Sequence, residues 1–319
     1  MSPSRSQSLR PVTADTGRLT LPAIVVHGGA GVFERIRETV DAERLLEGLA
    51  AALEAGWAVL SGGDRSTALD AVIEAVAALE DSGRFNAGRG AVKTSSGAHE
   101  FDASIMDGTT GKVGAICAAT WPANPVRVAR ALAEAGGVPD GPMLLAGSGA
   151  DRFAEEQGFA QMTAAMLASA SLERGNAPLF STEGTVGAVA VDIEGNVAAA
   201  TSTGGRAGQW QGRVGDSPIP GAGVWAAKDT AAVSATGAGE AFVVAGFSHR
   251  IDWKMRDGAP LAVAAAAALD AVSALGGDGG GIAITPDGTF TASFNSPAMA
   301  RGWRHGSGQV VKLFPAETP

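Results

Sequence analysis

Two threonines in the middle of the chain bound a pair of apolar segments, and their hydroxyls are candidates for nucleophilic chemistry. Thr185 opens the first segment and Thr203 closes the second, with a short break that contains Asp, Gly and Asn between them. Two apolar segments around such a break predict a buried β-hairpin. A turn centred on Glu194 would place Thr185 opposite Thr203, with Cβ atoms about 4.5–5.5 Å apart. The hairpin would therefore bring two hydroxyl groups together at its open end.

Threonine pairs across strands are also ordinary sheet stabilisers, so the chemical hypothesis depends on the residues around the pair. Gly184 leaves the peptide bond before Thr185 sterically open. Two polar, glycine-rich segments, 212–218 and 234–240, follow in an otherwise apolar part of the chain. A hydroxyl is a poor nucleophile until a base takes its proton, and a free α-amine, with a pKa of about 7.7–8.0, can be that base. Cleavage before Thr185 would thus put nucleophile and base on one residue.

The sequence offers few residues from which another kind of catalytic site could be built. With four histidines and one cysteine, the sequence shows no Ser/His/Asp triad and no cluster with metal-ligand spacing. The glycine segment HGGAG after the expected strand 21–26 lacks the spacing of nucleotide-binding loops. His27 in that segment is more typical of a hydrogen-bonded core histidine. A non-enzymatic protein that holds an amino acid or nucleotide at its glycine loops stays open as an alternative, and it predicts a single uncleaved chain.

Several motifs resemble those of the plant-type L-asparaginases, or isoaspartyl peptidases, which are N-terminal-nucleophile hydrolases. Around the hairpin these are GTVGAVAVDIEGNVAAATSTGG, GRVGDSPIPGAG and SATGAGE, and upstream they are HGGAG, RFNAGRGAV and FDASIMDG. The motifs follow the family's order, and the likeness covers roughly residues 22–310. The resemblance implies that the chain cleaves itself between Gly184 and Thr185, giving an α chain of residues 1–184 and a β chain of residues 185–319.

The resemblance also implies catalytic roles for residues of these motifs. Thr185 would be the nucleophile, and Thr203 would hydrogen-bond to it and tune its amine. The Thr236 hydroxyl and the Gly237 N–H would form an oxyanion hole, which holds the negative charge of the tetrahedral intermediate. Asn86 resembles the family's asparagine near the amine of the nucleophile. The substrate implied is L-asparagine or a β-aspartyl (isoaspartyl) dipeptide, cleaved through an ester on Thr185.

A second set of residues would bind the substrate. Arg213 suits an α-carboxylate, because its planar fork binds carboxylates through two parallel hydrogen bonds. Asp216 suits the α-ammonium group, and the resemblance adds Gly237 and the Gly239 carbonyl to the substrate site. The structural alternative is an ordinary salt bridge between Arg213 and Asp216. Glycosylasparaginase, a hydrolase with the same fold, is the alternative activity.

The resemblance implies one cofactor, a structural sodium ion held by main-chain atoms, and no other is expected. The loop that would hold it resembles the family's sodium-binding loop. Its residues are Leu79, Glu80, Ser82, Phe85, Ala87 and Arg89. Association as a homodimer of αβ units is likewise implied by the resemblance alone.

Composition excludes some partners. The 319 residues carry a formal net charge of −9 and a pI near 5.0, whereas nucleic-acid-binding surfaces are basic. The longest apolar run, 261–269, falls well short of the roughly 20 residues that span a bilayer. Cys117 has no partner for a disulfide and is expected to be buried. We therefore expect a cytoplasmic protein that binds neither nucleic acid nor membrane.

The apolar pattern predicts an α+β fold, since helices occur in pairs and strands in hairpins without βαβ alternation. The resemblance sharpens this to a four-layer αββα sandwich. We expect a flexible tail over 1–20, one domain over 21–319 and an exposed linker at 158–184. Helices are expected at 41–60, 66–79, 125–134, 150–157, 238–250 and 260–275. Beyond the hairpin, strands are expected at 21–26, 90–95, 100–106, 112–119, 143–147, 230–235, 281–285 and 289–294. Trp210 either narrows the pocket or covers apolar surface, and the second interpretation is preferred.

Overall fold

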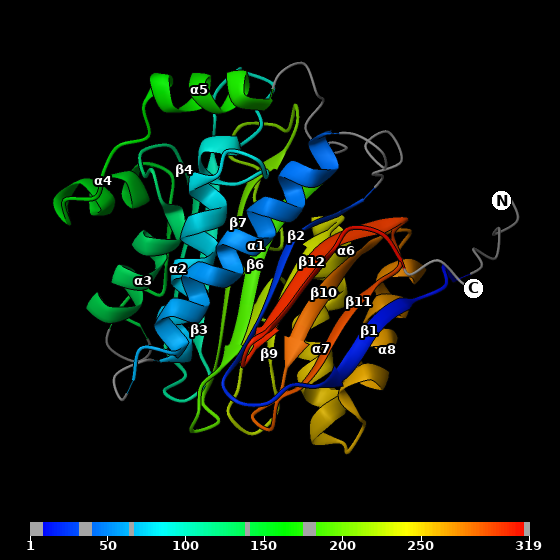
Figure 1. Cartoon of the computed structure of the whole chain (residues 1–319). Coiled ribbons are helices and arrows are strands. Elements are labelled where there is room, and N and C mark those ends of the chain that lie inside the picture. The colour runs from blue at the N-terminus through cyan, green and yellow to red at the C-terminus, as the bar shows by residue number, and fades with distance from the viewer. Residues whose placement is uncertain (1–8, 32–39, 64–66, 138–140, 175–182, 316–319) are drawn as a thin grey trace, which may run out of the picture.

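The computed structural model describes residues 9–31, 40–63, 67–137, 141–174 and 183–315, which form two β-sheets and their helices (Figure 1). In spatial order, the larger, eight-stranded sheet holds β13 (Gly308–Lys312), β12 (Ala298–His305), β2 (Ala23–Gly31), β6 (Glu183–Val191), β7 (Val197–Arg206), β3 (Phe101–Asp107), β4 (Val113–Ala119) and β5 (Leu144–Ala146). The smaller, five-stranded sheet holds β1 (Thr13–Arg18), β11 (Thr289–Phe294), β10 (Gly279–Ile284), β9 (Ala232–Gly237) and β8 (Val224–Ala226).

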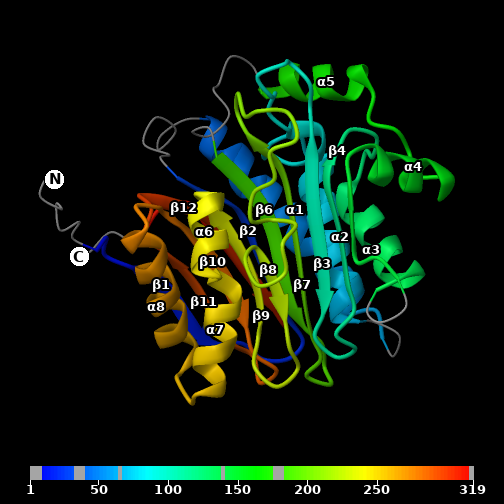
Figure 2. The ribbon, with the colours of Figure 1, turned by 180° about the vertical axis from the view of Figure 1, so that it is seen from behind.

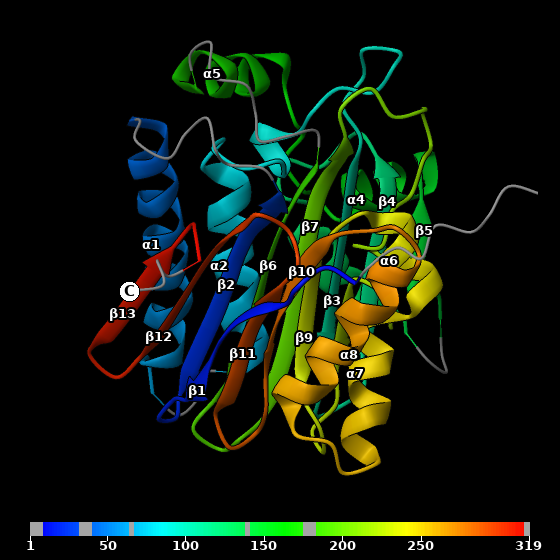
Figure 3. The same ribbon diagram turned by 90° about the vertical axis from the view of Figure 1, so that its right-hand side faces the viewer.

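The helices fall into two groups. The first group is α1 (Val40–Leu60), α2 (Ala68–Asp81), α3 (Pro125–Ala135), α4 (Ser148–Glu156) and α5 (Ala164–Arg174), and the second is α6 (Gly239–Ala245), α7 (Phe247–Arg256) and α8 (Leu261–Ala274). A side view shows α1 and α2 beyond the larger sheet, and α7 and α8 beyond the smaller one (Figure 3). The opposite view shows α6, α7 and α8 in front of the smaller sheet (Figure 2).

Three apolar clusters explain this arrangement. One joins α1, α2 and α3 to the larger sheet, and another joins α6, α7 and α8 to the smaller sheet. Between them, a cluster drawn almost wholly from strands packs the two sheets against each other. Strand β6 contributes to two of these clusters, Ala188 to the helix side and Val189 to the space between the sheets. Because both faces of β6 are buried, its sequence is an almost continuous apolar run.

The turn of the central hairpin is built by Asp192. Its side-chain Oδ1 accepts hydrogen bonds from the main-chain N–H groups of Glu194 and Asn196 at 3.0 and 2.9 Å. Gly195 has a φ of +79°, which glycine adopts without strain. The predicted hairpin is therefore confirmed, and its turn chemistry explains why the Asp/Gly/Asn break ends one strand and begins the next.

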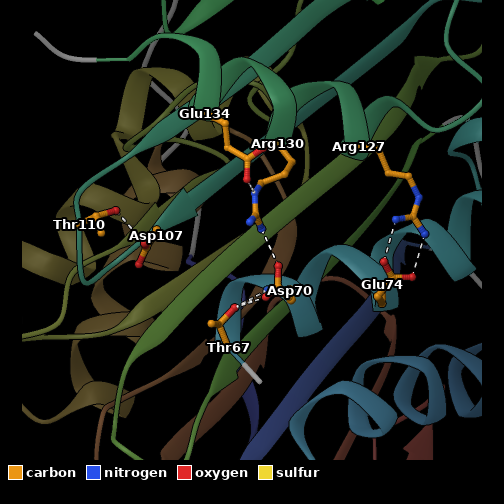
Figure 4. Close-up of polar contacts among 8 residues, drawn as sticks. All are labelled: Thr67, Asp70, Glu74, Asp107, Thr110, Arg127, Arg130 and Glu134. Carbon is orange, nitrogen blue, oxygen red and sulfur yellow. Dashed lines mark hydrogen bonds and ion pairs between the residues drawn. The ribbon is translucent and has the colours of Figure 1, made fainter. Parts of the chain in front are cut away.

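Ion pairs join α2 to α3 on the outer surface (Figure 4). Arg127 donates to both oxygens of Glu74 at 2.7 and 2.8 Å. Arg130 bonds to Asp70 at 2.8 Å and to Glu134 at 2.7 Å. These side chains are partly exposed, so each pair contributes at most about 1 kcal/mol. The network links α2 to α3 on the surface, while the buried apolar cluster that both helices share packs them together.

Most predicted elements are confirmed, and four differ. Residues 13–18 of the expected tail form β1, paired with β11, while residues 1–8 lie outside the described part of the chain. The expected helix 238–250 is two helices, because Gly246 adopts a left-handed φ of +58°. The expected strand 90–95 is absent, since a 3₁₀ turn occupies Gly88–Gly90.

The fourth difference concerns the expected linker at 158–184. Residues 164–174 form helix α5, whose Ala170 is fully buried, and a Cβ on Gly83 would lie only 2.7 Å from the Ala170 Cβ. The expected linker therefore contains a helix instead of irregular chain, although most of the described residues of 161–170 are exposed or half-buried, as a linker would be. Residues 175–182 lie outside the described part of the chain.

The sequence pattern also did not indicate β12 and β13. Strand β12 carries Arg301, which is fully buried and bonds to Asp15 of β1 at 2.6 Å. It also donates to the Met299 carbonyl at 2.8 Å. This ion pair connects β1 to β12, and Lys312 of β13, the last strand, also bonds to Asp15 at 2.7 Å. Within the described residues, no helix combines the length and the apolar character that a membrane span requires.

We predict that Gly114→Ala destabilises the fold. A Cβ at Gly114 in β4 would lie 1.9 Å from the main-chain oxygen of Ala129 in α3, so α3 must move away from the sheet. Overpacking of this kind costs about 1–3 kcal/mol of unfolding free energy. Gly149→Ala is the matched control, because Gly149 lies in exposed α4 with nothing within 4 Å of the added Cβ. Thermal melts should show a lower midpoint for Gly114→Ala only, and equal midpoints would contradict the packing described.

Candidate active site

The two threonines of the central hairpin face each other as predicted. Thr185 of β6 pairs with Thr203 of β7, and the register continues through Val186 with Ser202 to the turn. Thr185 is 7% exposed and Thr203 is 3% exposed. The hydroxyls therefore lie at a nearly closed site at the open end of the hairpin.

A β-bulge lies next to this pair. Glu183 pairs with Arg206 while Thr185 pairs with Thr203, so Gly184 alone faces two residues, Gly204 and Gly205. Gly205 has a φ of +77°, as the αL residue of a bulge requires. Bulges commonly adjoin active sites, where they redirect a side chain. Here the bulge stands opposite the Gly184–Thr185 peptide bond.

Asn86 holds the bulge in place. Its Nδ2 donates to the Gly205 carbonyl at 2.6 Å, and its main-chain carbonyl accepts from the Gly204 N–H at 2.9 Å. The side-chain Oδ1 accepts from the Val92 N–H at 3.0 Å. A Cβ on Gly184 would lie 3.3 Å from the Asn86 Cβ, so the residue does touch the predicted cleavage site. Its polar atoms are nevertheless committed to the bulge.

The Gly184 carbonyl is hydrogen-bonded by the neighbouring threonine. Thr203 Oγ1 donates to the Gly184 oxygen at 3.0 Å and accepts from the Gly205 N–H at 3.1 Å. The Thr185 Oγ1 lies 3.4 Å from the Ser217 hydroxyl. On the other side, a Cβ on Gly29 of β2 would lie 3.3 Å from the Gly184 Cα. The peptide bond is thus enclosed by main chain on two sides.

A small pocket opens at this point and gathers residues from distant parts of the sequence. It brings together six predicted site residues, which are Gly184, Thr185, Thr203, Arg213, Asp216 and Gly237. Its other lining residues are Gly205, Arg206, Gly215 and Ser217. Three predicted residues, Asn86, Thr236 and Gly239, adjoin the site without lining the pocket.

Arg213 does not form a salt bridge with Asp216, which was the structural alternative to a role in substrate binding. Its Nε and Nη2 donate to the two carboxylate oxygens of Glu240 at 2.9 and 2.8 Å. The Glu240 carboxylate raises the pKa of Arg213, against the lowering effect of burial. Glu240 on α6 therefore fixes the plane of the Arg213 guanidinium. A further edge of the guanidinium is directed to the pocket residues.

Asp216 is buried and only partly satisfied. It is 3% exposed, and among the described residues its Oδ2 has no hydrogen-bond partner. Burial raises the pKa of this carboxyl to about 7, although the nearby Arg213 acts in the opposite direction. A Cβ on Gly239 would lie 2.9 Å from Asp216 Oδ1 and 3.0 Å from Arg213 Nη2. Glycine at this position lets the start of α6 approach both charged groups.

Thr236 and Gly237 end strand β9 beside the pocket. Thr236 is 1% exposed, and within the described chain its hydroxyl has no hydrogen-bond partner. Gly237 has a φ of +149°, and a Cβ there would lie 2.4 Å from the Asp278 carbonyl oxygen. A buried donor without a partner is costly unless a ligand satisfies it, so this hydroxyl is available to a bound group.

Sequence reasoning missed three polar groups around the pocket. Ser217 directly follows Asp216, and Glu240 ends the SATGAGE motif, so both lay inside segments already singled out. Asp102 of β3 pairs in register with Thr203, and its Oδ1 accepts from the Ala118 N–H at 2.7 Å. Burial raises the pKa of Asp102 to about 6.

Histidine and metal chemistry have little support at this site. Burial lowers the pKa of His27 to about 3, and its Nε2 lies 2.9 Å from the Ser234 hydroxyl. It is therefore a neutral core histidine, as predicted. Across the residues that the structure describes, no group of three or more His, Cys, Asp and Glu side chains could hold a metal ion.

Comparison with known proteins decides the family. A family model described as "Asparaginase" matches residues 20–177 and 171–312, which is nearly the whole chain. The chain belongs to the asparaginase family. This confirms the resemblance drawn from the motifs.

Relatives of this asparaginase-family chain come from bacteria, archaea and animals. The chain is 41% identical over 301 residues to the isoaspartyl peptidase of Escherichia coli, covering 88% of this chain and 92% of that protein. It is 39% identical over 309 residues to the plant-type L-asparaginase of Pyrobaculum calidifontis, covering 89% and 97%. It is 39% identical over 292 residues to the isoaspartyl peptidase/L-asparaginase of Danio rerio, covering 88% and 91%.

The burial of Asp216 predicts a pH-dependent effect on stability in this asparaginase-family chain. Its pKa is about 7 when folded and near 3.8 in the reference state, so folding favours the protonated carboxyl. The associated stability is complete below the unfolded pKa and is lost as pH rises through about 7. Asp216→Asn should therefore raise the free energy of unfolding more at pH 8 than at pH 5, by an amount on the order of a few kcal/mol, which thermal or denaturant melts at the two pH values measure. Every other titrating group is common to both proteins, so an equal difference at the two pH values would contradict this account of Asp216.

Proposed function

We propose that the chain is a hydrolase that cleaves itself before Thr185 and then hydrolyses L-asparagine and β-aspartyl dipeptides. One observation carries the proposal. The Thr203 hydroxyl donates to the Gly184 carbonyl at 3.0 Å, in a pocket that also holds Thr185, Arg213 and Asp216. The names of the relatives, isoaspartyl peptidase and L-asparaginase, support the same substrates.

Self-cleavage would use groups already in contact. The Thr185 hydroxyl attacks the Gly184 carbonyl carbon, and negative charge develops on the oxygen to which Thr203 donates. The C–N bond then breaks, the nitrogen takes the proton that the Thr185 hydroxyl gave up and becomes the Thr185 α-amine, and the acyl group rests on Oγ1 as an ester. Water hydrolyses the ester and leaves chains 1–184 and 185–319. The bulge held by Asn86 supports this step, because it places the Gly184 carbonyl against Thr203.

The mature enzyme would hold its substrate by the amino-acid head group. Arg213 would bind the α-carboxylate, and the ionised Asp216, with its unsatisfied Oδ2, would bind the α-ammonium group. The Gly239 carbonyl would assist, because this residue lies against both charged side chains. L-Asparagine and β-aspartyl dipeptides share this head group, and each then presents a side-chain carbonyl to Thr185.

Hydrolysis would follow the same chemistry as self-cleavage. The Thr185 α-amine takes the hydroxyl proton, Oγ1 attacks the side-chain carbonyl, and the proton passes to the departing ammonia or amino acid. Thr236 Oγ1 and the Gly237 N–H would hold the developing oxyanion, and each such donor is typically worth about 3–4 kcal/mol. Water then hydrolyses the β-aspartyl ester, which releases L-aspartate.

The wider organisation belongs to the same proposal. The three apolar clusters support the four-layer αββα sandwich of N-terminal-nucleophile hydrolases, as one domain over 21–319. The homodimer of αβ units and the cytoplasmic location rest on the family resemblance and on composition.

A main-chain sodium site at the 79–89 loop fits the local backbone, because a Cβ on Gly88 would lie 2.8 Å from the Glu80 carbonyl oxygen. The loop thus brings main-chain atoms together; a bound sodium ion would brace it without entering the reaction.

The first test is the state of the chain itself. Purified protein should separate into two fragments on a denaturing gel, with Thr185 at the start of the second. Thr185→Ala should remain one chain and hydrolyse neither substrate. Thr203→Val should slow self-cleavage about 100-fold or more, because one donor to the developing oxyanion is lost. Thr110→Val, in the β3–β4 turn, is the matched control and should be cleaved normally. Fragments from Thr185→Ala would refute Thr185 as the nucleophile.

A second test concerns the ammonium site. Because the pKa of Asp216 is about 7, its carboxyl becomes neutral as pH falls below that value. The affinity for L-aspartate, whose ammonium and carboxylates stay charged between pH 5.5 and 8.5, should therefore rise with pH across this range. Calorimetric titration measures this directly. Succinate, which lacks the ammonium group, should show no such rise above about pH 6.5, where both of its carboxylates are ionised. A flat affinity for L-aspartate would exclude Asp216 from this role.

A further inference from the structure

A second hollow lies beside the catalytic pocket, on the outer side of Arg213. Its volume is about 430 Å³, within the range of small-molecule sites. The side chains that matter here are Arg206, Gln209, Trp210, Arg213 and Glu240. Nothing in the proposed reaction with L-asparagine uses this space.

The hollow and the catalytic pocket share two walls. Arg206 and Arg213 line both, so the two hollows adjoin at these side chains. Arg206 also pairs in register with Glu183, just before the predicted cleavage site.

The segment that carries Arg206 is firmly anchored. Gln209 Oε1 accepts from the Arg206 N–H at 2.8 Å and lies 3.4 Å from Arg213 Nη1. The Gly208 N–H donates to the Lys93 carbonyl at 2.7 Å. A Cβ on Gly205 would lie 2.3 Å from Gln209 Oε1, so the turn packs tightly on the bulge. The main chain of Arg206 is therefore held in a fixed position next to the pocket.

The charge of the hollow favours an anion. Its charged lining residues are two arginines and one glutamate, in a chain whose formal net charge is −9. Glu240 is bonded through both oxygens to Arg213, and the charges of Arg213 and Arg206 hold its pKa below the usual value. Trp210 is 83% exposed and does not cover apolar surface, contrary to the expectation from sequence. Its ring instead offers an apolar wall to a ligand in the hollow.

The two proposed substrates differ only in their leaving groups. Ammonia has no further atoms to bind, whereas a β-aspartyl dipeptide releases an amino acid that carries a carboxylate and a side chain. We propose that the hollow is a subsite for this leaving amino acid, with Arg206 binding its free carboxylate and Trp210 contacting its side chain. The inference rests on the proposed function and adds a specificity-determining residue to it.

The test pairs a change in the enzyme with a change in the substrate. The kcat/KM is measured for L-asparagine, for β-aspartyl-leucine and for β-aspartyl-leucinamide, in which a neutral carboxamide replaces the terminal carboxylate. Wild type should prefer the free dipeptide to its amide about 10-fold. Arg206→Gln should reduce this preference to about 1 and lower the ratio of dipeptide to asparagine turnover about 10-fold. Arg206→Lys should restore part of both ratios, because it retains a cation.

Controls separate this proposal from the function on which it rests. Arg152→Gln, an exposed arginine on α4, should leave both ratios at their wild-type values. All proteins are checked for complete cleavage, because Arg206 lies opposite the processing site. If Arg206→Gln does not fold or mature, the wild-type comparison of dipeptide and amide decides alone. Equal wild-type rates on the two, or equal losses on all three substrates in Arg206→Gln, would overturn the subsite while the hydrolase stands. No hydrolysis of any substrate by cleaved wild type would refute both.

Discussion

The register of β6 against β7 determines where every group of the site lies. Side chains on a strand alternate between faces, so a slip of one residue would turn Thr185 and Thr203 away from the pocket. Two features prevent such a slip. Asp192 fixes the turn at one end, and Asn86 fixes the bulge at the other. The strand between them is buried on both faces, so an alternative pairing would also place its valines and alanines against the wrong cluster.

Electrostatics impose a second constraint, because several carboxyl groups of the described chain are buried. Burial raises the pKa of Asp216 to about 7, of Asp102 to about 6 and of Glu80 to about 8. Glu80 accepts from the Ser202 hydroxyl at 2.6 Å, behind the strand that carries Thr203. The protein thus holds acidic groups in a poorly solvated region, and Arg206 and Arg213 are the cations that line the pocket. Buried carboxyl groups with raised pKa values are typical of functional sites, where a bound ligand supplies the opposite charge.

Local signals made much of the fold and site predictable. The facing threonines followed from a two-residue period and a turn, which are both local properties. The motifs placed Arg213, Asp216, Thr236 and Gly237 around them. Pairings across the fold were not predictable, because nothing near Arg213 in the sequence points to Glu240. The same holds for β1, an edge strand with mixed polarity whose structure depends on β11 and on the buried Asp15–Arg301 pair.

The strand order of the larger sheet has a consequence for a cleaved molecule. Strand β2 lies between β12 and β6, so a strand that precedes the predicted cut is flanked by two that follow it. In the smaller sheet, β1 likewise pairs with β11. The two products would therefore be interleaved, and separating them would mean breaking ladders on both edges of β2 together with the clusters above and below. A cut at Gly184 would change the covalent connectivity of the chain while its parts continue to fold, and to unfold, as one cooperative body.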